Sequence, residues 1–396
     1  MGCRSHRRPV SPPHPSSIAR HGRSNMSNTW TQLDLSILGG NIRAMQQALS
    51  RPVQIIFVVK ANAYGHGLKN VASHAAALGV QSFAVAHIDE AVALRRELPQ
   101  SQILVLGAIQ PDQVSQALES RISVAIADLE HGLALAASAA GRPLQCHIKV
   151  DTGMGRLGFA WETAATAIAR LASNPSLDIV GLCSHFATSD QPDPTFAAVQ
   201  NQRFQHVLAQ CSDNGLAIPF RHISNSGGFL THQDWDYDGV RAGLVLYGYQ
   251  PPGSHPRIHT SPCFQWKTRI VQAKQLPADS PVGYGCTYVT SCDTTIAILD
   301  VGYSDGYPTR LGNVASVLIG GRRVPVVGRV SMNLTAIDLG SASATVKPGD
   351  EVVLMGRQAD QSIWADEIAQ WAETIPYEIL TGIRTRDQRV TSSTTI

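Results

Sequence analysis

The sequence has no uninterrupted apolar run of the roughly 18–20 residues that a membrane-spanning helix needs, so no membrane association is expected. Only 6% of the 396 residues are aromatic, and the formal net charge is only +2. The first 25 residues hold five arginines and no Lys, Asp or Glu; beyond them, 27 basic residues face 30 acidic ones, a balance of −3. These figures argue against a basic or stacking surface for nucleic acids.

The cysteines are odd in number and scattered, and none are paired in a CxxC spacing. They stand at positions 3, 146, 183, 211, 263, 286 and 292. This pattern predicts neither a disulfide framework nor a metal site, and it favours a reducing compartment such as the cytoplasm.

Residues 1–26 differ from the rest of the chain. They are rich in Arg, Ser, Pro and His and contain no apolar segment, which argues against a secretory signal peptide. We expect a disordered tail or an upstream start codon with Met26 as the true beginning. A transit peptide stays open, although four prolines disfavour an amphipathic helix.

Eight apolar, β-branched runs follow, separated by Ala-rich segments with helical spacing such as 71–78 and 88–98. The runs are 54–59, 82–86, 102–107, 122–126, 145–150, 178–183, 220–224 and 240–246. Asp89, Asp112 and Asp128 stand where helix N-caps are expected. Eight such units over about 210 residues predict an α/β fold, a TIM (β/α)8 barrel over residues 36–262. No GxGxxG follows the first strand, which weighs against dinucleotide binding.

After about Phe264 the helical spacing disappears until Trp364–Trp371, and short strands separated by turn residues take its place. The predicted strands are 265–275, 294–300, 314–319, 323–328, 334–338 and 351–354. This predicts a second, mostly β domain made of residues 263–396. Residues 27–35 precede the first barrel helix and have no barrel partner, so we assign them to the second domain.

The first barrel strand ends in Lys60, and barrel active sites are built from the carboxyl ends of strands. A lysine that closes an apolar strand is partly desolvated, which lowers its pKa and frees the amine to act as a nucleophile or base. The alternative is a lysine that only extends into solvent.

Eight strings, one of which contains this lysine, follow one another along the chain. They are VVKANAYGHG (58–67), DTGMGRLGF (151–159), SHFATSD (184–190), HISNSGG (222–228), VRAGLVLYG (240–248), VGYGCTY (282–288), GYSDGYP (302–308) and GRVSMN (328–333). In content and order they resemble the alanine racemase family, from about residue 27 to the end. The resemblance implies a TIM barrel with a C-terminal β domain, and interconversion of L- and D-alanine.

The resemblance implies a two-base mechanism on a pyridoxal phosphate aldimine. Lys60 would hold the cofactor and act on one face, and Tyr288 of the partner subunit would act on the other. The active unit would then be a homodimer with composite sites. His185 matches the histidine beside that tyrosine, and Arg241 matches the residue that bonds the pyridine nitrogen.

Other matched residues imply binding roles. Arg156 would contact the cofactor phenolate and the substrate carboxylate. The backbone N–H of Met332 would donate a hydrogen bond to the same carboxylate. Lys149 matches a lysine that is often carbamylated; the alternative is an unmodified ion pair with Asp151 or another carboxylate. The implied phosphate ligands are Tyr64, Ser226, Gly243 and Leu244.

Two positions depart from the family's pattern. Asn333 replaces a usual Asp, and Thr385 in Ile383–Arg386 replaces a larger Tyr found in some members, so we expect a pocket that admits serine as well as alanine. Asp190, Arg310 and Arg329 resemble the polar ring along the route to the site.

Three alternatives remain open. They are a broader or serine-preferring racemase, a decarboxylase or aldolase on a related barrel, and a non-catalytic pyridoxal-phosphate-binding protein. The roughly 130 residues of the second domain, with Tyr288, argue against the last.

Overall fold

The computed structural model describes residues 27–49, 52–250, 257–340, 346–385 and 387–392. The expectations for residues 1–26, and that for Arg386, fall outside this part of the chain. Within the described residues, no helix has both the length and the apolar content needed to cross a bilayer.

The first sheet is a nearly closed parallel barrel of eight strands, which confirms the predicted fold class. Its strands are β2 (Gln54–Val58), β3 (Ser82–Val85), β4 (Gln102–Val105), β5 (Ser123–Ile126), β6 (Leu144–Asp151), β8 (Leu177–Cys183), β9 (Arg221–His222) and β10 (Gly239–Ala242). They pair in the order β10-β2-β3-β4-β5-β6-β8-β9, with the two-residue β7 (Phe159–Ala160) beside β6. The remaining gap is spanned by the bridge between Asn225 and Arg241 and by backbone hydrogen bonds from the N–H of Asp238 to Arg221 and from the N–H of Arg241 to Ser224. The predicted strand 240–246 ends early, because the chain turns after Ala242.

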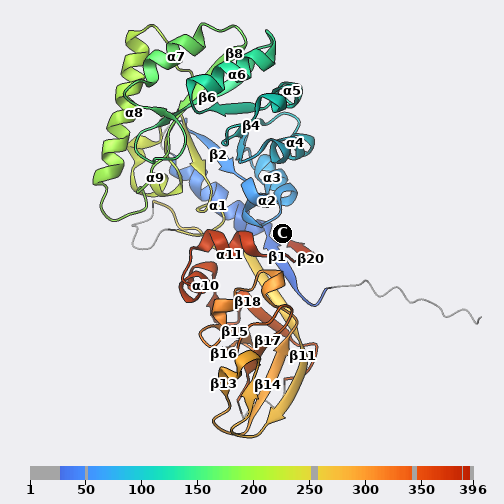
Figure 1. Cartoon of the computed structure of the whole chain (residues 1–396). Coiled ribbons are helices and arrows are strands. Elements are labelled where there is room, and N and C mark those ends of the chain that lie inside the picture. The colour runs from blue at the N-terminus through green and yellow to red at the C-terminus, as the bar shows by residue number, and fades with distance from the viewer. Residues whose placement is uncertain (1–26, 50–51, 251–256, 341–345, 386, 393–396) are drawn as a thin grey trace, which may run out of the picture.

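Helices cover the outside of this barrel (Figure 1). They are α1 (Leu35–Ala48), α3 (Leu68–Ala77), α4 (Ile88–Glu97), α5 (Val114–Glu119), α6 (Leu129–Ala139), α7 (Ala164–Ala172), α8 (Thr195–Asp213) and α9 (Ser226–Thr231). The longer helices bury one stripe; in α7, for example, Ala164, Ile168 and Leu171 are buried at spacings of four and three.

The predicted helix caps were partly wrong. Asp128 caps α6 and accepts the N–H of His131, as expected. Asp89 and Asp112 are not caps: α4 begins after His87, and Asp112 lies within a short 3₁₀ turn that begins after Gln110. Both aspartates still lie in a first turn, where a carboxylate favours the helix dipole.

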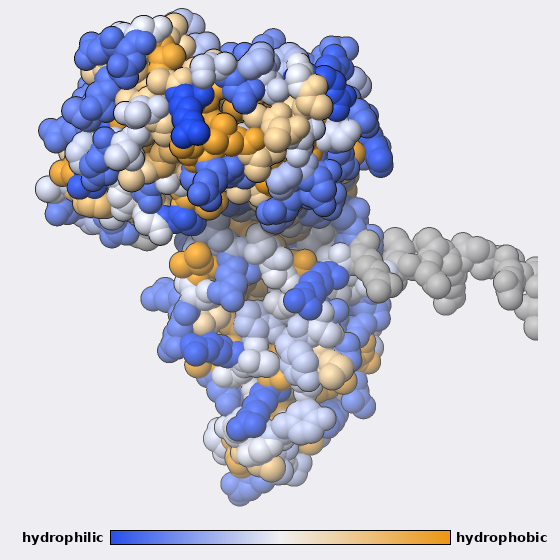
Figure 2. Space-filling view, turned by 45° about the horizontal axis from the view of Figure 1, so that its top comes forward, coloured by the Kyte–Doolittle hydropathy of each residue, from blue (hydrophilic) through white to orange (hydrophobic). Residues whose placement is uncertain are grey.

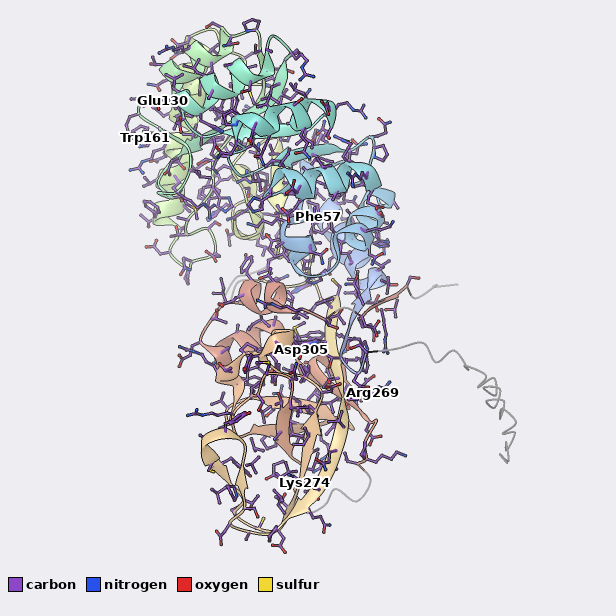
Figure 3. The ribbon with its side chains drawn as sticks, turned by 45° about the vertical axis from the view of Figure 1, so that its right-hand side comes forward. Phe57, Glu130, Trp161, Arg269, Lys274 and Asp305 are labelled. Carbon is purple, nitrogen blue, oxygen red and sulfur yellow. The ribbon has the colours of Figure 1, made fainter. Side chains whose placement is uncertain are left out.

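The second sheet is antiparallel except where β1 pairs with β20. Its strands are β1 (Trp30–Asp34), β11 (Phe264–Leu276), β14 (Thr294–Leu299), β15 (Ser316–Ile319), β16 (Arg322–Val327), β17 (Thr335–Asp338), β18 (Glu351–Gln358), β19 (Gln361–Ile363) and β20 (Asp387–Thr391). Pairing of β18 with β11 closes β11, β18, β15, β16, β17 and β14 into a ring. β11 runs to the far end of this part, as its residues Arg269 and Lys274 show (Figure 3).

Short elements of this second part were not predicted, because two to seven residues carry too little periodicity. They are β12 (Pro281–Val282), β13 (Tyr288–Val289), β19, β20 and α11 (Pro376–Gly382). The helix α10 (Ala365–Ala372) was expected. Figure 1 shows α11 at the junction, below the barrel.

After β2 the chain forms the short element α2 (Lys60–Tyr64), which begins with Lys60 and continues as a left-handed turn. Ala61, Asn62, Ala63 and Tyr64 all have φ between 51° and 55°. L-residues pay roughly 1–2 kcal/mol each for this conformation. The neighbouring Gly65 lets α11 approach, since a Cβ there would lie 2.3 Å from the carbonyl oxygen of Leu380.

Ala61 is exposed, so its substitution isolates this strain from packing. We expect Ala61→Gly to raise the free energy of unfolding by about 1 kcal/mol, because glycine adopts positive φ without the Cβ penalty. Urea denaturation measures the change. The matched control is Ala134→Gly on the exposed face of α6, which should lower stability by about 1 kcal/mol. A loss of stability at both positions would contradict a strained turn.

Candidate active site

A cavity of about 650 Å³ opens at the carboxyl ends of the barrel strands. This is the end where barrel enzymes place their active sites, and the volume suits a small-molecule ligand. Nine of the eleven predicted site residues line it: Lys60, Tyr64, Lys149, Arg156, His185, Ser226, Arg241, Gly243 and Leu244. Asp190 lines it too.

The side chain of Lys60 lines this cavity, two residues after the end of β2. The backbone behind it is held by Glu90, whose carboxylate accepts the N–H of Ala61 at 2.6 Å and that of Ala86 at 3.0 Å. Burial lowers the pKa of the Lys60 ammonium, and the Arg156 guanidinium lowers it further, while Glu90 partly opposes both. The result is an amine that loses its proton more readily than an exposed lysine.

Arg241 lies fully inside the barrel core and donates to five acceptors. Its Nη1 lies 2.6 Å from His222 Nδ1 and 3.0 Å from the His222 carbonyl oxygen. Its Nη2 bonds the carbonyls of Ser184 (2.5 Å) and Ile223 (2.9 Å) and lies 3.1 Å from His185 Nδ1. A guanidinium has no acceptor, so both histidine Nδ1 atoms must accept.

The histidines around Arg241 are neutral. Burial, with the charge of Arg241, lowers the pKa of His185 and His222 well below its ordinary value, and that of His147 to about 4. A neutral imidazole that accepts at Nδ1 carries its proton at Nε2. His185 therefore presents an N–H rather than a lone pair on its other side.

Lys149, which is partly exposed, lies near Arg156 and Arg241. Burial lowers the pKa of Lys149 to about 8; Arg241 and Arg156 act in the same direction, whereas Cys183 and Asp151 oppose it. Oδ1 of Asp151 already accepts the backbone N–H groups of residues 153, 154 and 155. This end of the barrel therefore gathers three basic side chains, a setting that favours an anion.

One side of the cavity is built for a small polar group. Asn225 caps α9 through the N–H of Gly228, and the adjacent Ser226 Oγ accepts the N–H of Gly243 at 3.0 Å. A Cβ at Gly243 would lie 2.9 Å from Tyr64 Oη, so glycine is required for this approach. These hydroxyl and N–H groups converge without a cationic patch, as in phosphate sites of barrels.

Tyr288 and Met332 are not brought to the cavity of their own chain, nor are Arg310 and Arg329; none of these four is among the described residues that line it. Met332 is 55% exposed. The Tyr288 hydroxyl donates to Asp338 Oδ2 at 2.6 Å, and this bond, with burial and the carboxylate charge, raises the pKa of Tyr288 to about 12. The phenol is therefore protonated near neutral pH.

The structure corrects the expectation of a pocket widened at Thr385. Its hydroxyl donates to the Thr29 carbonyl at 2.8 Å, and it is not among the described lining residues. Tyr377 of α11 lines the cavity instead, with its ring 5.8 Å from that of Tyr64. Asn333 donates to Ser304 Oγ at 2.8 Å.

Sequence reasoning missed His222, Glu90 and Tyr377 as site residues. His222 opens the string HISNSGG, so its position in a strand end was a usable signal. Glu90 and Tyr377 lie on helices with no local signal of their role.

Two family models match the chain. The N-terminal domain of alanine racemases matches residues 33–251, and their C-terminal domain matches residues 263–391. The alanine racemase of Symbiobacterium thermophilum is 41% identical, over 92% of this chain and 97% of that protein. That of Halothermothrix orenii is 39% identical, over 91% and 96%.

Solved structures agree. The alanine racemase of Clostridium difficile 630 superposes with a TM-score of 0.88 at 30% identity, covering 93% of this chain and 97% of that one. The alanine racemase of Bartonella henselae, solved with covalently bound pyridoxal phosphate, has a TM-score of 0.83 at 27% identity, with 92% and 99% covered.

The barrel, the mostly β second part and the matched relatives together define an amino-acid racemase, a class of isomerase. Within that class, the chain belongs to the alanine racemase family.

The buried neutral histidines predict a loss of stability in acid. The pKa of His66, packed between Tyr247 and Phe264 with its Nε2 unpartnered among the described residues, is lowered by burial from 6.5 to about 4. Between these values the unfolded chain binds more protons than the folded one. The free energy of unfolding should therefore fall as pH decreases from 6.5 to 4, by up to about 1.4 kcal/mol per pH unit for each such histidine.

Urea denaturation at several pH values between about 7 and 5 measures this slope. His66→Phe keeps an aromatic ring but removes one titrating group, so it should make the slope shallower by about one proton. Equal slopes in the two proteins would contradict the assignment.

Proposed function

We propose that this enzyme interconverts L- and D-alanine by a two-base mechanism that uses pyridoxal phosphate held at Lys60. The observation that carries the proposal is the Lys60 amine with its lowered pKa, facing a cavity that also holds Arg241 and the Ser226–Gly243 pocket. The relative from Bartonella henselae with covalently bound pyridoxal phosphate supports the same cofactor here.

The cavity fits that group. Lys60 supplies the amine that condenses with an aldehyde, while Ser226, Tyr64 and the backbone N–H groups of Gly243 and Leu244 supply phosphate donors. The absence of a Cβ at Gly243 provides the room between Tyr64 and the backbone. When bound, the cofactor supplies an electron sink for the carbanion left when the α-proton is removed.

Arg241 would hold the cofactor's pyridine nitrogen by donating a hydrogen bond. A guanidinium does not release its proton, so it leaves that nitrogen unprotonated. This makes the electron sink weaker and disfavours reactions such as transamination that need a stronger one. The neutral His185 and His222 keep Arg241 oriented without supplying a proton of their own to the ring.

The second base would be the partner's Tyr288, in a head-to-tail homodimer with two composite sites. Support comes from large apolar side chains exposed on the second part of this chain: Tyr284 is 72% exposed, Val289, the residue after Tyr288, 49% and Met332 55%. The partner's Met332 would direct its N–H to the substrate carboxylate. Because Asp338 keeps the phenol protonated, Tyr288 begins as a proton donor and Lys60 removes the first proton when the substrate is the enantiomer whose α-proton faces Lys60; the two roles are exchanged for the other enantiomer.

Arg156 would pair with the substrate carboxylate and is held in place by a carbamate on Lys149. Three basic side chains gathered at one end of the barrel favour an anion between them, and Asp151 is already occupied by three N–H groups. An amine whose pKa is lowered to about 8 is partly neutral near physiological pH, which is the form that reacts with carbon dioxide.

The carbamate predicts incorporation of ¹³C from labelled bicarbonate. One protected carbonyl resonance should appear in the ¹³C spectrum of the enzyme and vanish in Lys149→Arg, which keeps the charge but cannot be carbamylated. Lys69, exposed and paired with Glu97, provides the control: Lys69→Arg should keep the resonance. A spectrum without the resonance in the unmodified enzyme would refute the carbamate.

The two-base mechanism predicts that Tyr288→Phe separates the two proton transfers. In deuterium oxide, exchange of the α-proton should fall by about a hundredfold or more for one enantiomer, because only one face loses its base, while the other enantiomer still exchanges. Chiral chromatography and mass spectrometry of recovered alanine measure both. Tyr284→Phe, an exposed neighbour, is the matched control and should exchange normally.

Mixing the inactive Lys60→Ala and Tyr288→Phe proteins tests the composite site. Each mixed dimer would contain one complete site, so subunit exchange should restore about a quarter of full activity. Full exchange of both enantiomers by Tyr288→Phe, or no recovery on mixing, would contradict the mechanism. A pyridoxal-phosphate-binding protein without catalysis would show no exchange, and a broader racemase would turn over L-serine within about a hundredfold of L-alanine.

A further inference from the structure

A chain of hydrogen bonds runs from the active-site cavity through the barrel core to its opposite end. It passes from His185 to Arg241 and from Arg241 to His222, and it continues from His222 Nε2 to His147 Nδ1 over 3.0 Å. The two imidazoles meet edge to face at an interplanar angle of 80°. His147 thus ends a series whose first member faces the substrate cavity.

His147 also lines a second cavity, of about 320 Å³, at the amino ends of the strands. Polar residues around it include Ser82, Gln102 and Gln145, and its apolar lining includes Phe83 and Phe220. The barrel face turned away from the second part has apolar side chains at its middle and hydrophilic ones around them (Figure 2). His147 is 9% exposed, more than His222 or Arg241.

The direction of every proton in this series follows from Arg241. The guanidinium only donates, so His222 accepts at Nδ1 and, being neutral, carries its proton at Nε2. His222 Nε2 must then donate to His147, which accepts at Nδ1 and carries its own proton at Nε2. His147 is the acceptor that selects this tautomer of His222.

The barrel makes room for this contact. Gly181 of β8 lies beside the His147 ring, and a Cβ there would lie 2.4 Å from Nδ1, the atom that accepts from His222. Glycine at this position therefore leaves the acceptor uncovered. The imidazole edge also packs against the Phe220 ring, at 6.3 Å between centroids.

We propose that His147 is a positioning residue for the reaction: it holds His222 in the Nε2-protonated tautomer and thereby keeps Arg241 oriented toward the active-site cavity. The catalytic consequence rests on the proposed function, whereas the tautomer itself does not. Without an acceptor at His147, the buried N–H of His222 loses its partner. His222 is then free to shift its proton or turn its ring, and Arg241 loses an acceptor.

The test compares two substitutions of similar size. His147→Gln offers a side-chain carbonyl that can still accept from His222, whereas His147→Leu offers none. In ¹⁵N spectra of histidine-labelled enzyme, with the His222 signal assigned by its loss in His222→Asn, we expect the Nε2-protonated tautomer in the unmodified enzyme and in His147→Gln. His147→Leu should lose that pattern.

Kinetics supply the second readout. We expect His147→Leu to lower kcat by about tenfold or more with little change in KM, because substrate contacts are intact, and His147→Gln to stay near the unmodified enzyme. A purely structural role would lower both variants alike.

Two results would overturn the proposal: a His222 proton on Nδ1 in the unmodified enzyme, or an unchanged His222 pattern in His147→Leu. The first does not depend on His147→Leu, so it decides the question even if that variant fails to fold. If the His222 pattern changes in His147→Leu as expected but kcat does not, the positioning role is refuted. That result leaves the two-base mechanism untouched, because the mechanism is tested separately through Tyr288→Phe.

Discussion

The guanidinium of Arg241, buried in the barrel core without a carboxylate partner among the described residues, imposes the main constraint on this structure. Arg241 must direct its N–H groups at neutral acceptors, since an unsatisfied buried charge costs several kcal/mol. The acceptors come from Ser184, His185, His222 and Ile223, which lie at or just beyond the ends of β8 and β9. One side chain of β10 therefore joins the strands on the side where the pairing of the barrel sheet is reduced to a bridge and a few backbone hydrogen bonds. The same bonds dictate the histidine tautomers.

This constraint also explains the charge of the cavity. Burial, with the charge of Arg241, keeps the nearby histidines neutral, and Arg241 and Arg156 bring positive charge to this end of the barrel. A site of this kind binds anions without a large basic surface, which agrees with a chain whose body is slightly acidic. A phosphate, a phenolate and a carboxylate are the groups that the proposed cofactor and substrate bring.

Much of the barrel could be predicted because parallel strands buried on both faces are nearly continuous apolar runs, as in 54–58 and 102–105. Residues such as Lys60 and Ser226 could be placed because strand ends of a barrel share one face. The positions that escaped prediction depend on long-range contacts. Thr385 bonds to Thr29, 356 positions away, and no local pattern indicates that Tyr377 takes the place beside Tyr64.

The turn after Lys60 connects fold stability to the site. Four consecutive residues with positive φ are unfavourable, and such strain persists only where surrounding contacts compensate for it. Here the compensation comes from both parts of the chain: Glu90 binds the turn from α4, and α11 packs over Gly65 and carries Tyr377 into the cavity. The position of the lysine amine is therefore set jointly by the barrel and by a helix of the second part. On an unstrained helical turn, local backbone preferences would be enough to orient the lysine side chain. Here its orientation depends on contacts from α4 and α11, which exist only in the assembled fold.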